Sequence, residues 1–229
     1  MSSFVTAFKE LAKSLNIKYK DVNLYFQAFT HKSYSNEHKV PCNERLEFIG
    51  DAILDFLVGE FMYETYPDMP EGELSKKRAA FVCEEANKNY SLKLGLDKLI
   101  LLGKGLEKEG GRTRPAVLGD LFEAFLGALY LDNKNLSEVR KILKMVVFPN
   151  ILGEASYLKD YKSELQEQIQ AENRKSVTYV LENEVGPSHD KTFTISVYFE
   201  NVKLGEGVGK THKEAEQLAA KQALDKLAK

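Results

Sequence analysis

The spacing of apolar residues changes once along the 229-residue chain, and this change constrains the fold more than any other feature. Up to about residue 157 the apolar residues recur at helical spacing, as in ERLEFIGDAILDFLVGEFMYETY and VLGDLFEAFLGALYL. After residue 159 the segment FTISVYF places Phe193, Ile195, Val197 and Phe199 on one side of a strand, with a period of two. The sequence therefore predicts an all-α domain followed by a small α+β domain.

The order of elements in the second part follows from its neighbouring segments. VTYVLENEVGP and KLGEGVG are predicted as two further strands, with helices in SELQEQIQAEN before them and KEAEQLAAKQALDKLA after them. The predicted order is α-β-β-β-α. We therefore expect a helical domain over residues 1–152, a short linker over 153–159 and the α+β domain over 160–229.

Two connections in the helical part are predicted from their turn-forming residues. YPDMPEG is expected to end one helix, and GKGLEKEGGRTRP is expected to be a Gly-rich charged loop. Arg112 and Arg114 in that loop precede a second acidic helix and could guide phosphates toward metal ions bound there, and a flexible solvated loop is an equal alternative.

Composition limits the class of protein without naming its function. A hydrophobic content of 43% is enough for ordinary buried cores. With 32 Lys and Arg against 34 Asp and Glu the formal charge is −2, so any argument for nucleic-acid binding must rest on local clusters. Cys42 and Cys83 are too few for a disulfide framework and are expected to be reduced thiols. With no leader or membrane span expected, the predicted location is the cytoplasm.

An acidic stripe lies in the apolar helix that begins near residue 44. At about 100° per residue, Glu44, Glu47 and Asp51 fall within roughly 60° of one another, and Asp55 extends the same stripe. The rest of this helix is apolar nearly all round, which predicts burial in a core or an interface. Like charges in a low-dielectric environment repel one another and lose hydration, so this stripe requires compensation.

A second acidic pair, Asp120 and Glu123, repeats the i, i+3 spacing inside LGDLFEAFLGALYL. Converging carboxylates without His or Cys partners suit Mg²⁺ or Mn²⁺ better than zinc, and two such ions can activate water at a phosphodiester. The alternative is a set of buried salt bridges to Arg45, Arg78 or nearby lysines. The second stripe and the scarcity of basic residues on both helices favour the metal site.

A basic group precedes the last predicted helix. GVGKTHKEAEQLAA places Lys210, His212 and Lys213 at a loop leading into that helix, where free N–H groups and the helix dipole favour an anion. A solvated helix start is the alternative for a basic triplet taken alone.

Four collinear segments resemble the ribonuclease III family. NERLEFIGDA looks like its signature motif, and THKSY at 30–34, EGELSKKRAAFV at 71–82 and VLGDLFEAFLGALYLD at 117–132 follow in the family's order. Residues 160–229 resemble a double-stranded RNA-binding domain. The resemblance implies a homodimeric, Mg²⁺-dependent endonuclease for double-stranded RNA, with Mn²⁺ able to substitute. It further implies 5′-phosphate and 3′-hydroxyl ends with short 3′ overhangs, and processing of ribosomal RNA precursors and structured messenger RNA. Neither a small-molecule cofactor nor a membrane partner is expected.

The resemblance also implies roles for residues of the helical part. The expected metal ligands are Glu47, Asp51, Asp120 and Glu123, and the expected catalytic residues are Glu44, Asp51 and Glu123. Phe48 matches a side chain that inserts into the partner subunit, with ordinary core packing as the alternative. Glu71 matches an acid near the dimer interface. The resemblance gives Asp55 no role.

In the second domain the resemblance implies three RNA contact regions. Gln166, Glu167 and Gln170 are expected at one minor groove, His189 at the next, and Lys210, His212 and Lys213 at phosphates across the intervening major groove. The family usually has a lysine where this chain has His212. A histidine is mostly neutral near pH 7, so we expect a weaker or pH-dependent contact there.

Three other functions are weighed against this one. A metal-independent ribonuclease would use His31 and His38 as acid and base, but it leaves both acidic stripes unexplained. A duplex-binding protein that has lost its chemistry is disfavoured by the intact acids. A helical bundle of purely structural role predicts that removing the acids stabilises the fold without changing RNA turnover.

Overall fold

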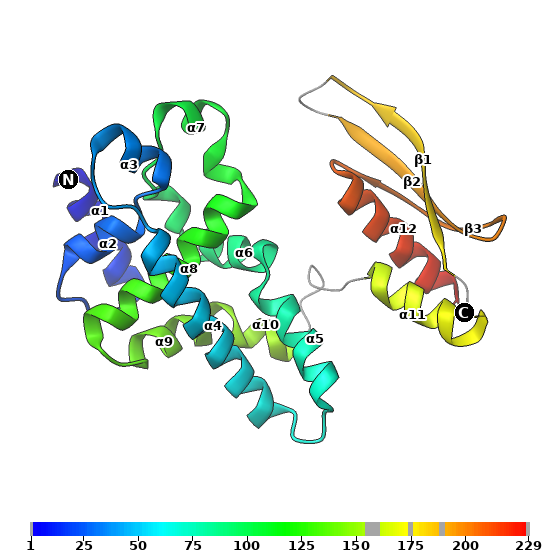
Figure 1. Cartoon of the computed structure of the whole chain (residues 1–229), viewed down its shortest axis with the longest axis horizontal. Helices are drawn as coiled ribbons and strands as arrows, with labels where there is room; N and C mark the ends of the chain where they lie inside the picture. The colour runs from blue at the N-terminus through cyan, green and yellow to red at the C-terminus, as the bar shows by residue number, and fades with distance from the viewer. Residues whose placement is uncertain (1, 154–160, 174–175, 188–190, 228–229) are drawn as a thin grey trace. The chain divides into compact units, whose positions relative to one another are not determined.

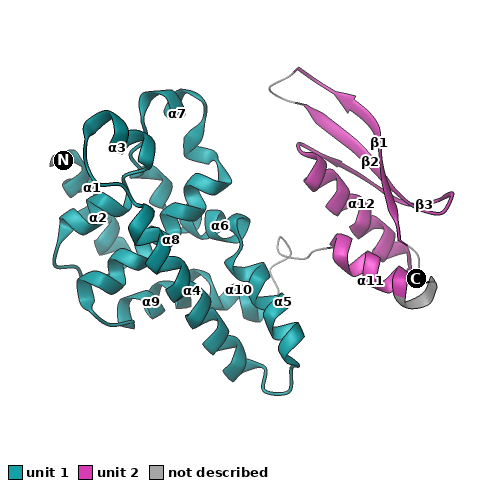
Figure 2. Cartoon of the chain, viewed as in Figure 1, with its two compact units in different colours: residues 1–158 teal, residues 159–229 magenta. Residues whose placement is uncertain are grey.

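The computed structural model describes residues 2–153, 161–173, 176–187 and 191–227. The chain forms two compact units, Met1–Leu158 and Lys159–Lys229 (Figures 1 and 2). The first is helical and the second is α-β-β-β-α, which confirms the predicted fold class. Apart from Gly153, which ends a helix, the linker expected over 153–159 lies outside the described residues and stays a prediction.

The first unit is built from α-helices and two short 3-10 helices. In chain order they are α1 (Ser2–Ser14), α2 (Val22–Ala28), α3 (Lys32–His38), α4 (Glu44–Thr65), α5 (Glu71–Val82), α6 (Glu84–Leu94), the 3-10 helix η1 (Leu96–Lys98), α7 (Lys104–Lys108), the 3-10 helix η2 (Gly111–Thr113), α8 (Pro115–Asn133), α9 (Ser137–Val146) and α10 (Phe148–Gly153).

Helix α8 lies at the centre of the first unit. It packs against α4, α6, α2 and α9, and it is buried on nearly every side because its sequence is apolar almost throughout (Figure 1). Aromatic rings tie the N-terminal helices to it, as Phe29 packs edge-on against Phe125 with ring centroids 6.0 Å apart. Phe61 of α4 stacks on Phe148 of α10 at 4.0 Å.

The second unit packs two helices against one face of a three-stranded antiparallel sheet. Its elements are α11 (Tyr161–Asn173), β1 (Thr178–Val185), β2 (Thr192–Phe199), β3 (Val202–Gly209) and α12 (His212–Leu227), with the strand order β1-β2-β3. The predicted inward residues Ile195 and Val197 are buried. A Cβ on Gly205 or Gly207 of β3 would lie 2.3 or 2.2 Å from a backbone oxygen of α12, so strand and helix approach without intervening side chains.

One predicted loop is wrong. GKGLEKEGGRTRP was expected to be irregular, but it forms α7 and η2, because Arg112 binds Glu107 at 2.7 Å and donates to the backbone oxygens of Asp97 and Ile100. Arg112 therefore holds the segment together, and Arg114 pairs with Glu109 at 2.9 Å. The predicted break at YPDMPEG is confirmed between α4 and α5.

None of the helices in the described residues has the length and apolar character that a membrane crossing requires. Cys42 is half-buried, Cys83 is exposed, and both are free thiols.

Candidate metal and RNA site

Two glycines allow α4 and α8 to cross at backbone contact. A Cβ added to Gly50 would lie 1.8 Å from the backbone oxygen of Glu123, and one added to Gly127 would lie 2.2 Å from the backbone oxygen of Leu46. Neither position therefore accepts a side chain. The crossing places the turns of α4 that carry Glu47 and Asp51 directly against the turn of α8 that carries Glu123.

Glu123 is the most perturbed carboxyl group of this crossing. Burial raises its pKa to about 8, and the negative charges of Asp51, Asp120 and Glu47 act in the same direction. The side-chain amide of Asn87 on α6 opposes this by donating a hydrogen bond of 2.8 Å to Oε1. Glu123 is thus held among three acids that the sequence placed on two separate helices.

Glu47 and Asp120 respond to the same environment. Burial raises the pKa of Glu47, followed by the charges of Asp120, Glu44 and Asp51. Burial also raises the pKa of Asp120, followed by the charge of Glu84 at the start of α6. Carboxylates from α4, α8 and α6 therefore act on one another as a single electrostatic group.

Basic residues neutralise other acids of α4, but not these. Lys32 pairs with Glu44 at 2.7 Å and lowers its pKa, and Arg78 of α5 pairs with Asp55 at 3.3 Å. No Lys or Arg in the described residues forms an ion pair with the four predicted metal ligands, which are Glu47, Asp51, Asp120 and Glu123. The salt-bridge alternative therefore applies to Glu44 and Asp55, whereas no basic residue in the described part of the chain pairs with the four remaining acids.

Glu47, Asp51, Asp120 and Glu123 together are called the acidic group here. Its donor set fits a hard divalent cation. All its donors are carboxylate oxygens, no basic residue in the described part of the chain pairs with them, and burial raises the pKa values of Glu123, Asp120 and Glu47. Among the described residues, no three His, Cys, Asp or Glu side chains lie close enough together to form a complete metal-binding group.

An apolar stripe follows the exposed side of α4. Phe48 is 78% exposed, Phe56 58% and Tyr63 75%, and Ala52 between them is also exposed. Core packing within the protomer is thus wrong as an explanation of Phe48. Glu71, the other residue expected near a subunit interface, is exposed at the first turn of α5 and accepts a hydrogen bond from Ser75 at 2.8 Å.

In the second unit the predicted phosphate contacts gather at the start of α12. Lys210, His212 and Lys213 are all exposed there. Thr211 Oγ1 accepts the backbone N–H of Glu214 at 3.1 Å, and the Glu214 carboxylate accepts the backbone N–H of Lys210 at 2.6 Å. This reciprocal cap fixes the helix start. The ring of His212 lies 4.4 Å from that of Phe193, so one side of this imidazole is covered.

The predicted minor-groove contacts line one hollow beside α11. Gln166, Glu167 and Gln170 border it, together with Lys162, Ser163 and Tyr179. Gln166 is partly committed to the fold, because its Oε1 accepts the backbone N–H of Val177 at 3.2 Å. His189, the remaining predicted contact, lies outside the described residues.

The histidines of the metal-independent alternative have structural roles. His31 is the N-cap of α3, where its Nδ1 accepts the backbone N–H of Ser33 at 3.0 Å, and burial lowers its pKa. His38 ends the same helix and stacks on Tyr34 at 4.0 Å. The seven-residue step between the two imidazoles spans about 10 Å along the axis, too far to serve one phosphate directly.

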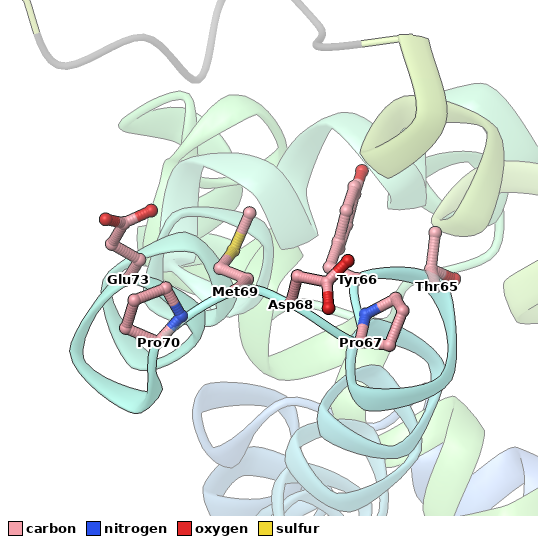
Figure 3. A pocket seen from close by; sticks show the side chains of 7 residues that line it. All are labelled: Thr65, Tyr66, Pro67, Asp68, Met69, Pro70 and Glu73. Carbon is pink, nitrogen blue, oxygen red and sulfur yellow. The ribbon is translucent and has the colours of Figure 1, made fainter.

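A separate hollow lies at the turn between α4 and α5 (Figure 3). Its lining residues are Thr65, Tyr66, Pro67, Asp68, Met69, Pro70 and Glu73. Thr65 is fourteen residues from Asp51, which is roughly 20 Å along the helix, so this hollow is not part of the acidic group. The Tyr66 hydroxyl donates to the backbone oxygen of Ile151 at 3.1 Å and anchors the turn to α10.

Two residues beside the acidic group were not found from the sequence. Asn87 and Glu84 lie on α6, which has neither an acidic stripe nor a motif that draws attention to them. The two adjacent acids at the start of that helix, Glu84 and Glu85, look like ordinary N-terminal acids. Only the packing of α6 on α8 reveals their proximity to the crossing.

Comparison with known proteins identifies both units. Residues 21–151 match the family model described as Ribonuclease-III-like, and residues 161–227 match that of the double-stranded RNA binding motif. Proteins named Ribonuclease 3 from Bacillus cereus and Bacillus anthracis are each 50% identical over 225 residues, covering 96% of this chain and 91% of the relative. The solved nuclease domain of ribonuclease III from Campylobacter jejuni is 40% identical, with a TM-score of 0.55, over 61% of this chain and 96% of that one.

A helical unit with concentrated carboxylates, followed by a duplex-RNA-binding unit, defines a class of two-domain ribonucleases. This chain belongs to the ribonuclease III family, and it is an endonuclease, hence a hydrolase, of double-stranded RNA. Enzymes of this family generally depend on a metal ion.

Proposed function

We propose that this protein is a homodimeric, Mg²⁺-dependent ribonuclease that cuts double-stranded RNA in the cytoplasm and leaves 5′-phosphate and 3′-hydroxyl ends with short 3′ overhangs. Mn²⁺ substitutes for Mg²⁺. The substrates are ribosomal RNA precursors and structured messenger RNA. The observation that carries the metal requirement is the cluster of half-buried and exposed acids around Glu123, with which no basic residue in the described part of the chain pairs.

In this proposal Glu47, Asp51, Asp120 and Glu123 bind the metal through their carboxylate oxygens. Burial and mutual repulsion raise the pKa values of Glu47, Asp120 and Glu123, and the positive charge of a divalent ion would offset both effects. When bound, the metal activates water and stabilises the leaving oxygen. Glu44 stands at the edge of the group, where its ion pair with Lys32 keeps it ionised.

The homodimer is proposed from the apolar stripe of α4. Exposed aromatic rings at Phe48, Phe56 and Tyr63 lie along one side of α4, and exposed apolar surface of this kind marks protein interfaces. The solved Campylobacter jejuni nuclease domain is described as structurally flexible in a region involved in its dimer formation. A two-fold pairing through α4 would give a duplex two acidic groups, one for each strand, with Phe48 inserting into the partner and Glu71 near the interface.

RNA binding is proposed for the second unit. Lys210, His212 and Lys213 would hold phosphates at the N-terminus of α12, where the dipole and the free N–H groups favour anions. Gln166, Glu167 and Gln170 would touch one minor groove and His189 the next. Substituting Lys213→Ala should weaken binding equally for all duplex sequences and lower the slope of log affinity against log salt by about 1.

The decisive experiment is cleavage of a long duplex RNA by the purified chain with Mg²⁺, with EDTA, and after Glu123→Gln. We expect cleavage only with metal and the native residue, with 5′-phosphate and 3′-hydroxyl product ends. Cleavage that survives EDTA, or that leaves 2′,3′-cyclic phosphate, contradicts the metal mechanism. Binding without any cleavage by the native chain would indicate a duplex-binding protein that has lost its chemistry.

A further inference from the structure

Asn87 is a polar residue at a completely buried position beside the acidic group. It lies on α6 with 0% of its surface exposed. Its Nδ2 donates to Glu123 Oε1 at 2.8 Å and to the backbone oxygen of Val82 at 3.3 Å. Asn87 therefore links α6 to Glu123, the acid whose pKa burial raises most.

The orientation of this amide follows from its neighbours. The backbone oxygen of Val82 can only accept a hydrogen bond, so the amide nitrogen faces it and also faces Oε1 of Glu123. The other end, Oδ1, is buried and has no hydrogen-bond partner in the described part of the chain. Within the described residues, the side chain is held by two hydrogen bonds, one to Glu123 and one to the backbone oxygen of Val82.

Helix packing alone does not explain an asparagine here. One turn later on the same helix, Ser91 is equally buried and donates to the backbone oxygen of Leu118 at 2.6 Å, which already links α6 to α8. Burying an amide with one end unsatisfied destabilises the folded chain relative to a satisfied amide, whereas an apolar side chain of similar size would avoid that cost. The specific gain at Asn87 is the hydrogen bond to the carboxylate.

We propose that Asn87 is a positioning residue that holds Oε1 of Glu123 in one orientation and leaves the lone pairs of Oε2 for a divalent cation. Hydrogen bonds to ligating carboxylates act in this way at metal sites, where they set ligand orientation. The inference rests on the proposed metal site and adds to it a residue from a third helix.

The test is a titration of the full chain with Mn²⁺ in the absence of RNA, in which electron paramagnetic resonance measures the free and bound ion. Asn87→Leu removes the donor at similar volume, and Ser91→Ala is the matched control, because it removes a buried hydrogen bond between the same two helices. We expect Asn87→Leu to weaken Mn²⁺ binding by about 10–100-fold. Ser91→Ala should lower the melting temperature and leave the Mn²⁺ dissociation constant unchanged. If Asn87→Leu does not fold, Asn87→Ala, which cannot overfill the site, supplies the same comparison.

Two outcomes separate this inference from the proposed function. If the native chain binds no Mn²⁺, or Glu123→Gln binds it as tightly as the native chain, the proposed metal site itself fails. If the native chain binds Mn²⁺ and Glu123→Gln weakens binding, but Asn87→Leu binds as Ser91→Ala does, the metal site stands and the role of Asn87 is overturned.

Discussion

Helix α4 carries two kinds of acid along its length, and their neighbours distinguish them. Glu47 and Asp51 face the crossing with α8, where other carboxylates surround them. Asp55 and Glu60, one and two turns further on, form ion pairs with arginines from α5 and α9. The same residue types at helical spacing therefore serve two purposes. The helix packed alongside decides whether an acid is neutralised within the protein or left with charge that a cation can bind.

The comparison is tested most severely by Glu47→Gln. We expect duplex cleavage to fall by more than about 100-fold, because losing this proposed metal ligand should cost more than losing an outer hydrogen-bond partner. The readout is the initial rate with saturating Mg²⁺. Glu64→Gln, an exposed substitution near the end of the same helix, is the control and should cleave normally. An equal loss of cleavage rate in both variants would show that the position of an acid on α4 does not determine its effect on cleavage.

The crossing itself is tested by Gly50→Ala. The added Cβ would overlap the backbone oxygen of Glu123 at 1.8 Å, and backbone cannot move aside as a flexible side chain can. Overpacking of this kind costs about 1–3 kcal/mol or more of unfolding free energy, measured by urea denaturation. Gly72→Ala on α5 is the matched control. It meets no atom within 4 Å and should not destabilise the protein. A native-like denaturation midpoint for Gly50→Ala would contradict the close approach.

The raised pKa of Glu123 also predicts how the stability of the metal-free chain depends on pH. The pKa of Glu123 is about 8 in the folded chain against an ordinary value of 4.5, so the folded state retains a proton that the unfolded state loses. Its contribution to stability is complete below pH 4.5 and is lost as the pH rises through about 8. The measurement is the melting temperature in EDTA at each pH of this range. The difference in melting temperature between the native chain and Glu123→Gln isolates the contribution of Glu123. A difference that does not change with pH would refute it, and added Mn²⁺ should restore stability at the alkaline end.

The smallest expected effect belongs to the paired acid. Asp55→Asn breaks a half-exposed ion pair with Arg78, which is worth about 0–1 kcal/mol. Cleavage and Mn²⁺ affinity should stay at native values. A loss of metal affinity in this variant would show that Asp55 contributes to metal binding. It would contradict the division of the α4 acids into those paired with arginines and those that bind metal.

The sequence predicted the elements well, because periodicity is a local property. The change from helical spacing to alternation located both units, and the i, i+3 spacing of Asp120 and Glu123 pointed to a second acidic helix. The segment containing α7 failed because Arg112 orders it through contacts with Asp97 and Ile100, which no local pattern encodes.

The surroundings of the acidic group were only partly predictable. Spacing put Asp55 on the stripe, but its partner Arg78 comes from another helix and was visible only as one of several candidate bases. Asn87 could not be predicted, since a single asparagine in a helix has no periodic signal, and its importance depends on the acid it meets. The partners of Asp55 and Glu123 come from other helices, so only the tertiary packing reveals them.

The glycine contact between α4 and α8 has a consequence for tolerance to mutation. Where side chains separate two helices, each core substitution shifts the interhelical distance by a fraction of an ångström, and anything mounted on those helices moves with it. At Gly50 and Gly127 the main chains themselves set the spacing. The two acid-bearing turns are therefore insulated from changes in core side chains elsewhere. The core of this protein can accumulate substitutions while the relative position of these turns stays the same.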